Sequence, residues 1–145
     1  MNGYLAVIDR LRADGPLGLL IGGSSVTTAK IFPGDAPQTM ASPYIRVESF
    51  DTEAYDTKSG IATTDTDIIK VFNCAPDDYT CSLMSTRVRN SLDGASGVFN
   101  GLTVEIFRYL RSDTYDMQVL NKSASMHQRI RVHEHDYEVR VRVNQ

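Results

Sequence analysis

The sequence has few of the residues that mark the common classes of small functional site. Its 145 residues contain no tryptophan and only two cysteines, Cys74 and Cys81. Their spacing does not match the close pairs of zinc or redox sites, and two cysteines do not make a disulfide framework. We therefore expect a reduced pair, buried as small hydrophobic side chains in a cytosolic setting.

An excess of positive charge and long apolar runs are also missing. The chain has 15 Lys plus Arg against 18 Asp plus Glu, a net charge of -3. Proteins that grip nucleic-acid phosphates need a basic excess, so a DNA-binding protein of that kind is not expected. The apolar run from Leu17 to Ile21 is far shorter than the roughly 20 residues of a membrane span. The N-terminus shows no basic region followed by an apolar one, so secretion is not expected either.

No catalytic constellation stands out, and we expect neither an enzyme nor a cofactor. His133 and His135 would share one side of a strand, but they need a third ligand to hold a metal. The alternative for this pair is a solvated edge at a bulge. The acidic run that begins at Asp51 lacks the ligand spacing of a calcium loop. An enzyme would require an apolar pocket with converging titratable groups near His133 or Cys74.

The hydrophobic patterning predicts an α+β protein whose residues 1–145 form one domain. Helices are expected over Gly3–Ala13 and from Pro76 to Leu92, the second opened by Pro76 and two acids. Strands are expected at Val26–Phe32, Tyr44–Phe50, Asp67–Asn73, Leu102–Leu110, Met117–Leu120 and Arg129–Val143. Because few helices separate neighbouring strands, we expect a twisted antiparallel sheet with two α-helices packed on one face.

Three irregularities in the pattern carry expectations of their own. Leu17 to Ile21 predicts a short apolar turn or 3₁₀ segment. Asp113 to Asp116 breaks the alternation of the preceding strand. In the last segment the buried phase slips across Glu134 to Asp136, which favours a bulge or turn there.

A polar segment from Asp51 to Thr66 separates two neighbouring strands and exceeds an ordinary hairpin loop. Either the two strands extend into a long β-hairpin arm, or the loop is mobile until a partner orders it. Both alternatives place the segment outside the core. The arginines of the last strand suit either solvent or an acidic neighbouring subunit. They are Arg129, Arg131, Arg140 and Arg142.

The order of these features resembles the tail-terminator, or tail-completion, proteins at the head-tail joint of long-tailed bacteriophages. The segments that carry the resemblance are Tyr4–Ala13, Val26–Phe32, Pro43-Tyr44-Ile45-Arg46-Val47, the Thr/Asp/Gly-rich arm ending in Gly60, Ile68–Phe72, Tyr79–Leu92 with its Val88-Arg89-x-x-Leu92 ending, and Tyr137–Val143. The sequence departs from the family at Cys81, where such proteins often carry Ala, and over Ser112–Gln128, which does not align.

The resemblance implies a structural virion protein. It would form a homo-oligomeric ring of six subunits that caps the tail tube, stops its growth and joins it to the head-side connector or stopper. DNA would pass through the lumen without sequence-specific binding. The protein would assemble in the host cytoplasm and end in the tail or neck of the virion, with the tail tube protein as a partner and no cofactor, metal or membrane.

Two groups of residues follow from this resemblance as hypotheses. The first is an inter-ring arm of Asp51, Glu53, Tyr55, Asp56 and Lys58. The second is a subunit interface near Arg140 and Arg142. The alternative function is another neck or tail structural protein, either a head-completion (stopper) protein or a tube protein, because these share the small α+β format.

Overall fold

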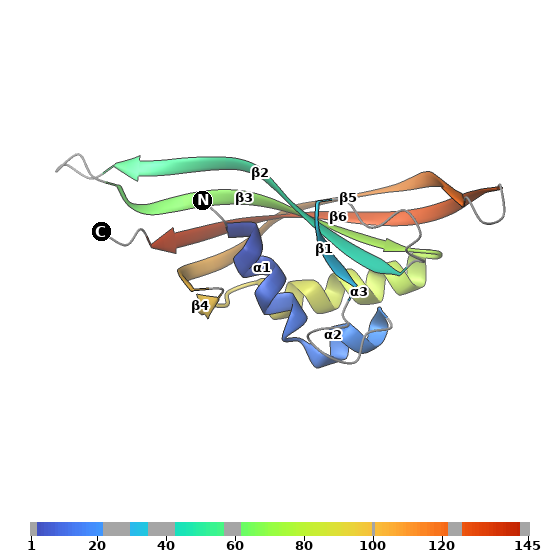
Figure 1. Cartoon of the computed structure of the whole chain (residues 1–145), viewed down its shortest axis with the longest axis horizontal. Helices are drawn as coiled ribbons and strands as arrows, with labels where there is room; N and C mark the ends of the chain where they lie inside the picture. The colour runs from blue at the N-terminus through green and yellow to red at the C-terminus, as the bar shows by residue number, and fades with distance from the viewer. Residues whose placement is uncertain are drawn as a thin grey trace.

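A six-stranded sheet with helices on one face forms the body of the protein (Figure 1). The computed structural model describes residues 3–21, 30–34, 43–56, 62–99, 101–121 and 126–142, with side chains except at 51–56, 62–65, 118–121 and 126–128. In chain order the elements are α1 (Gly3–Arg12), α2 (Gly15–Leu20), β1 (Ile31–Pro33), β2 (Tyr44–Asp56), β3 (Ala62–Ala75), α3 (Asp78–Leu92), β4 (Gly97–Phe99), β5 (Leu102–Asn121) and β6 (Met126–Arg142). The expected α+β class is confirmed.

The strand order is β1-β2-β3-β6-β5-β4, and the sheet is antiparallel except at one edge. There β1 pairs with β2 in parallel, Ile31 opposite Ile45. The expected antiparallel pairing therefore holds for the other described strand pairs and is wrong for β1. Residues 34–43 separate the two strands, so no tight hairpin forces them to run in opposite directions. The strand expected over Val26–Phe32 begins only at Ile31, and its positions 26–29 lie outside the described residues.

The helices α1, α2 and α3 all lie on the same side of the sheet (Figure 1). A third helix, α2, forms where a short turn was expected, so the two-helix prediction is wrong. Asp14 explains the difference, because its carboxylate accepts the Leu17 N–H at 3.1 Å and caps the helix, with Pro16 in the first turn. Asp77 caps α3 in the same way, accepting the Thr80 N–H at 2.8 Å. None of the helices in the described ranges is long and apolar enough to cross a membrane.

Two long strand pairs extend from the body to opposite ends of the molecule (Figure 1). The β2–β3 pair continues as far as Asp56 opposite Ala62, and positions 57–61 of the polar segment lie outside the described residues. The long β-hairpin arm stays a prediction. The β5–β6 pair continues to Asn121 opposite Met126. The break expected at Asp113–Asp116 is wrong, because these residues stay paired inside β5.

The strand β6 lies between β3 and β5 and is buried on both faces. Tyr137, Val139 and Val141 pack in the main core under the helices. Ile130 and Val132 lie on the opposite face, in a second cluster. Pairing with β3 runs from Arg142 to Arg131 without a shift, so the bulge expected at residues 134–136 is wrong. The apparent slip in phase is a change of the buried face along one regular strand.

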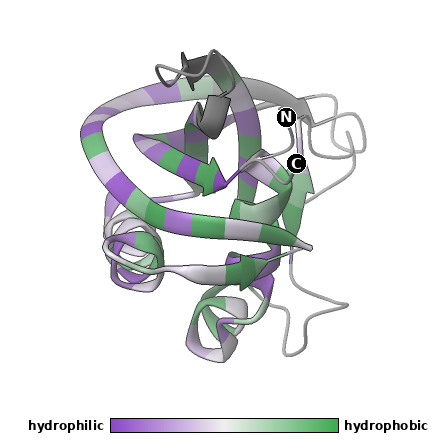
Figure 2. Ribbon diagram, turned by 90° about the vertical axis from the view of Figure 1, so that its left-hand side faces the viewer, coloured by the Kyte–Doolittle hydropathy of each residue, from purple (hydrophilic) through white to green (hydrophobic). Residues whose placement is uncertain are grey.

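The second cluster occupies the face that the helices do not cover. Its buried members come from β2, β3 and β6, and they are Tyr44, Phe72, Cys74, Ile130 and Val132. Partly buried Phe32 of β1 and Tyr115 and Met117 of β5 pack against them. Seen end-on, the sheet is strongly curled (Figure 2). This curl lets strands from across the sheet bury apolar side chains without a covering helix.

The main core makes a testable prediction through two leucines. Leu11 of α1 is fully buried, whereas Leu19 of α2 is 73% exposed. Leu11→Ala should lower the free energy of unfolding by about 2–5 kcal/mol, since it removes buried methyl groups and leaves a cavity. Leu19→Ala should change it by less than about 0.5 kcal/mol. Urea denaturation of the two variants measures both, and equal losses would contradict the assigned packing.

Candidate assembly surfaces

Carboxylates follow one another at alternate positions of β6 on the helix-free face. They are Glu134, Asp136 and Glu138. Lys70 of β3 holds the first two, with Nζ 2.6 Å from Glu134 and 3.5 Å from Asp136. The hydrogen bond to Glu134 and the nearby Asp136 charge raise the pKa of Lys70 against the effect of burial. From the other side, Arg111 of β5 lies 2.6 Å from Asp136. One buried carboxylate thus joins three adjacent strands.

Glu138 also has two cationic partners, Arg108 of β5 at 2.8 Å and Arg140 of β6 itself at 3.3 Å. The carboxylates are much more deeply buried than the arginines that bind them. The side chains of Asp136 and Glu138 are 3% and 9% exposed, whereas those of Arg108 and Arg111 are 60% and 66% exposed. Solvent therefore meets guanidinium groups here, with the carboxylates beneath them.

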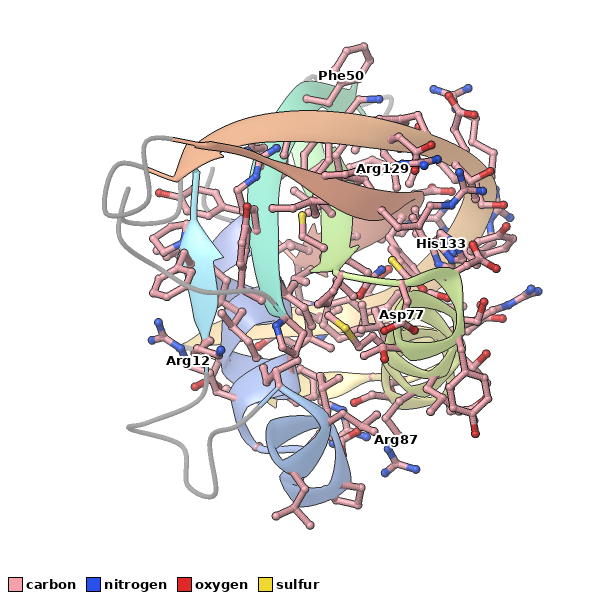
Figure 3. All side chains as sticks on the ribbon, turned by 90° about the vertical axis from the view of Figure 1, so that its right-hand side faces the viewer. Arg12, Phe50, Asp77, Arg87, Arg129 and His133 are labelled. Atoms are coloured by element: carbon pink, nitrogen blue, oxygen red, sulfur yellow. The ribbon has the colours of Figure 1, made fainter. Side chains whose placement is uncertain are left out.

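Beside Arg111 the surface forms a cavity of about 290 Å³. Its lining is polar and consists of Lys70, Arg111, Ser112, Asp113, Glu134 and Asp136. Phe50 lies nearby, with its ring centroid 4.8 Å from the Lys70 Nζ. It occupies a bulge in β2 and projects from the sheet with 61% of its surface exposed (Figure 3). An exposed aromatic ring therefore marks the start of the extended part of β2.

His133 connects β6 to α3 on the helix side of the sheet (Figure 3). Its Nε2 lies 2.9 Å from Asp78 Oδ1, and its Nδ1 lies 3.4 Å from Ser85 Oγ. The solvated edge expected for His133 and His135 is wrong, because both are 8% exposed in an interior strand. Ser85 is buried and donates to the Ser82 carbonyl at 3.2 Å, so its hydroxyl is not offered to a substrate. Among the described residues no set of three His, Cys, Asp or Glu side chains could hold a metal.

Both cysteines are free and buried, as expected. The Cys81 Sγ lies 2.9 Å from the Asn73 carbonyl oxygen and 3.3 Å from that of Arg131, where α3 crosses β3 and β6. Burial raises the pKa of Cys74 to about 11 and that of Cys81 to about 12. Neither thiol is activated as a nucleophile.

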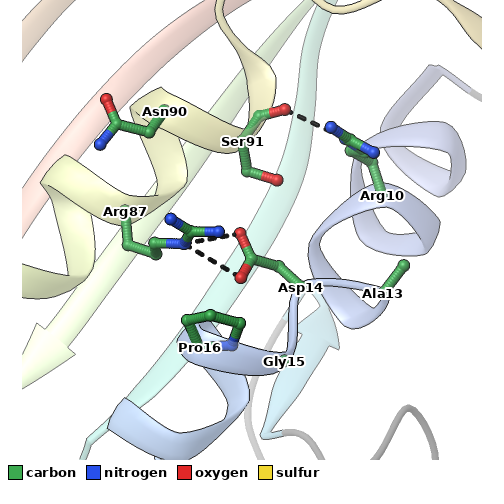
Figure 4. Close-up of a pocket in the computed structure, with 8 residues that line it drawn as sticks. All are labelled: Arg10, Ala13, Asp14, Gly15, Pro16, Arg87, Asn90 and Ser91. Carbon is green, nitrogen blue, oxygen red and sulfur yellow. Dashed lines mark hydrogen bonds and ion pairs between the residues drawn. The ribbon is translucent and has the colours of Figure 1, made fainter.

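A polar cavity of about 240 Å³ lies between the three helices (Figure 4). Arg87 of α3 meets both carboxylate oxygens of Asp14 at 3.0 Å, and Arg10 of α1 donates to the Ser91 carbonyl at 3.0 Å. Asp14 also caps α2, so these contacts fix the helices to one another. The cavity is a structural joint of the helical layer.

The residues of the two sequence hypotheses fall at one end of the sheet. Asp51, Glu53, Tyr55 and Asp56 lie on the β2 backbone that pairs with β3, and Lys58 lies outside the described residues. Arg140 and Arg142 stand opposite Thr66 and Thr64 of β3 in the same chain. Their ion pairs are internal, with Glu138 at 3.3 Å and Glu105 at 3.6 Å.

Sequence reasoning missed Lys70, Arg108 and Arg111. The signal available was the run of acids at every second position from Glu134 to Glu138, in a strand whose other side continues with Tyr137, Val139 and Val141. Acids so placed need cations from the flanking strands. Only the register of the sheet shows which cationic side chains pair with these acids.

No protein-family model and no curated protein matches this sequence. Among solved structures, a chain of the "Virion of native gene transfer agent (GTA) particle" is similar, with a TM-score of 0.68 and 22% sequence identity. The likeness covers 97% of this chain and 96% of that chain. The two chains share their fold.

The pKa of His135 makes stability depend on pH. Burial, followed by the charges of His133 and Arg89, lowers this pKa from 6.5 to about 4, while Asp136 opposes the shift. Between these values the unfolded chain binds a proton that the folded chain does not, so the stability due to this group falls as the pH drops from 6.5 to 4. Denaturation midpoints across this range should fall less steeply for His135→Gln. An unchanged slope would contradict the buried, neutral histidine.

The raised pKa values of the thiols give a second prediction. At pH 8 the folded protein should react with iodoacetamide far more slowly than the urea-unfolded chain, because little thiolate forms and both sulfurs are buried. Mass spectrometry counts the added groups. Tyr79→Cys provides the positive control, since Tyr79 is 74% exposed on α3. Rapid labelling of both native cysteines in the folded state would contradict the packing.

Proposed function

We propose that the protein is a structural component of a phage-like virion, located in the tail or neck, that forms a ring at the end of the tail tube. The ring stops tube growth and joins the tube to the head-side connector, and DNA passes through its lumen. The observation that carries the proposal is the fold, which is shared along almost the entire length of a virion chain. The resemblance to tail terminators supplies the finer role.

The edges of the sheet support assembly into a ring. Among the residues that the structure describes, the edge strand β1 pairs with β2 at Ile45–Val47 and β4 pairs with β5 at Leu102–Val104. Beyond these points β2 and β5 each have a single strand neighbour within the described residues. Long uncovered strand edges invite pairing with another chain. When two different edges of identical subunits meet, the contact is heterologous, and it closes into a ring if the rotation allows.

In this proposal residues 1–145 act as one domain, six copies form the ring, and the tube protein and the head-side connector bind its two faces. Asp51, Glu53, Tyr55, Asp56 and Lys58 contact an adjacent subunit or ring, and Arg140 and Arg142 lie near the subunit boundary. The net charge of -3 suits a channel for DNA, because a basic lumen would bind phosphates and retard transit. Assembly takes place in the host cytoplasm and involves no catalytic step.

Deletion of the gene in the producing host tests this role. We expect heads and tails that fail to join, with tail tubes of irregular length under the electron microscope, and we expect plasmid-borne wild type to restore joined particles. A tagged copy should be found by immunogold labelling at the head-proximal end of the tail. Label along the whole tail would instead indicate a tube protein, and label on tail-free heads would indicate a stopper. Normal particles from the deletion strain would sink the proposal.

A further inference from the structure

We infer that the acidic strand ends of one copy, residues 51–56 of β2 and 62–65 of β3, dock on the arginine face of the next copy. We define that face as the exposed side chains of Arg108 and Arg111 with the cavity beside them. The inference deepens the proposed function by naming a contact between subunits, and it rests on that function only for the existence of a ring.

The acidic strand ends concentrate negative charge without a base on the same residues. They contain four acids and no basic residue, namely Asp51, Glu53, Asp56 and Asp65, and Lys58 is the only base in the sequence between them. With Lys58 included, this segment carries the same net charge as the whole chain, so the rest of the protein is neutral overall. A partner surface for this segment must therefore offer positive groups locally, since the body has no net positive charge.

The arginine face offers such groups. Arg111 binds Asp136 through Nε, and Arg108 binds Glu138 through one terminal nitrogen. The remaining guanidinium nitrogens of both arginines make no hydrogen bond or ion pair with another part of the chain that the structure describes. The two carboxylates lie beneath the guanidinium groups, where they cannot approach an incoming anion closely. An acidic strand would therefore meet donors first.

The surroundings of Arg111 suit an incoming strand. The adjacent cavity of about 290 Å³ has room for a carboxylate side chain. The outer edge of β5 is bound at Phe107 by Gly94 and Ala95, and at Tyr109 by the Asp93 carboxylate. From Arg111 onward, β6 is the one strand that pairs with β5 in the described residues. Charge, space and an uncovered edge thus coincide on one stretch of β5.

The two segments lie on strands that are not neighbours within one chain. β3 and β6 separate β2 from β5 in the sheet order. The row of Arg108 passes through Glu138 and Ile68 to Asp51, and residues 53–56 lie beyond this row, on the side away from Arg111. Each copy of the protein carries both the acidic strand ends and the arginine face. The acidic strand ends of one copy can therefore bind the arginine face of a second copy. Repetition of the contact is head-to-tail, as a closed ring requires.

Disulfide trapping on the full-length protein tests the contact. One sample carries Glu53→Cys or Ala54→Cys, which sample both faces of the strand, and the other carries Asp113→Cys. Asp113 lines the cavity and leaves both arginines in place. Mixing the samples under mild oxidation should give a cross-linked pair on a non-reducing gel, and a chain carrying both cysteines should give a ladder. The buried Cys74 and Cys81 stay unreactive. Tyr79→Cys is the matched control, because Tyr79 is exposed on the helix side. It should not cross-link with the acidic strand ends.

Arg108→Gln with Arg111→Gln, added to the Asp113→Cys chain, tests the role of charge. Glu138 retains its ion pair with Arg140, and Asp136 retains its ion pair with Lys70. The variant should therefore fold, which circular dichroism can verify. The yield of cross-linked pairs at limiting concentration should fall by roughly fivefold or more. It should also fall with added salt in the wild-type background.

Three results would overturn the inference. The first is the absence of cross-links between the acidic strand ends and residue 113, and the second is equal cross-linking to residue 79. The third is the formation of dimers between two acidic strand ends in the Glu53→Cys or Ala54→Cys sample alone. Retardation of duplex DNA that requires Arg108 and Arg111, without trapping of the arm, would instead make this face a nucleic-acid surface. If trapping fails while the protein still caps tails, the ring contact is elsewhere. If trapping succeeds while the protein is absent from particles, the proposed function fails.

Discussion

The burial of β6 on both faces is the constraint on which the rest of the structure depends. An interior strand with apolar side chains on one face at one end, and on the other face at the other end, needs cover on two sides. Helices α1 and α3 cover one side, and the curl of the sheet covers the other. Between the two clusters the helix-free face carries carboxylates, and each is stable there because Lys70, Arg108, Arg111 or Arg140 reaches it.

Local patterns predicted the elements whose signal lies within a few residues. α1 and α3 appear where the apolar stripe and the opening acids predict them, and the strands expected at Tyr44–Phe50 and Asp67–Asn73 lie within β2 and β3. The failures come from information that a local pattern lacks. The pattern in β6 was read as one buried face with a bulge, because a strand that changes its buried face has the same sequence signature as a strand that slips by one residue. The parallel pairing of β1 depends on where a connection returns, which no residue type specifies.

One of the two candidate surfaces could be predicted from the sequence, and the other could not. The acidic strand ends could be found from composition alone, since acids, threonines and a length beyond any hairpin loop set them apart. The arginine face could not, because Arg108 and Arg111 look like ordinary exposed residues until the register places Glu138 and Asp136 beneath them. His133 shows the opposite error. A pair of histidines on one strand suggested either a metal or solvent, and the helix that buries them is distant in sequence.

Pairing each buried acid with an exposed arginine would have a consequence in the proposed ring, where subunits associate and DNA passes. The net charge of the face is close to zero, so it exerts little pull on a polyanion that is farther away than the screening length of about 8–10 Å. At contact range the outer guanidinium nitrogens are nearer to a partner than the carboxylates are, so a strand laid directly against them meets positive charge. Such a surface distinguishes a partner held in register from DNA moving past at a distance. The ion pairs that stabilise the buried carboxylates of β6 would then also make the surface selective for a partner strand over DNA.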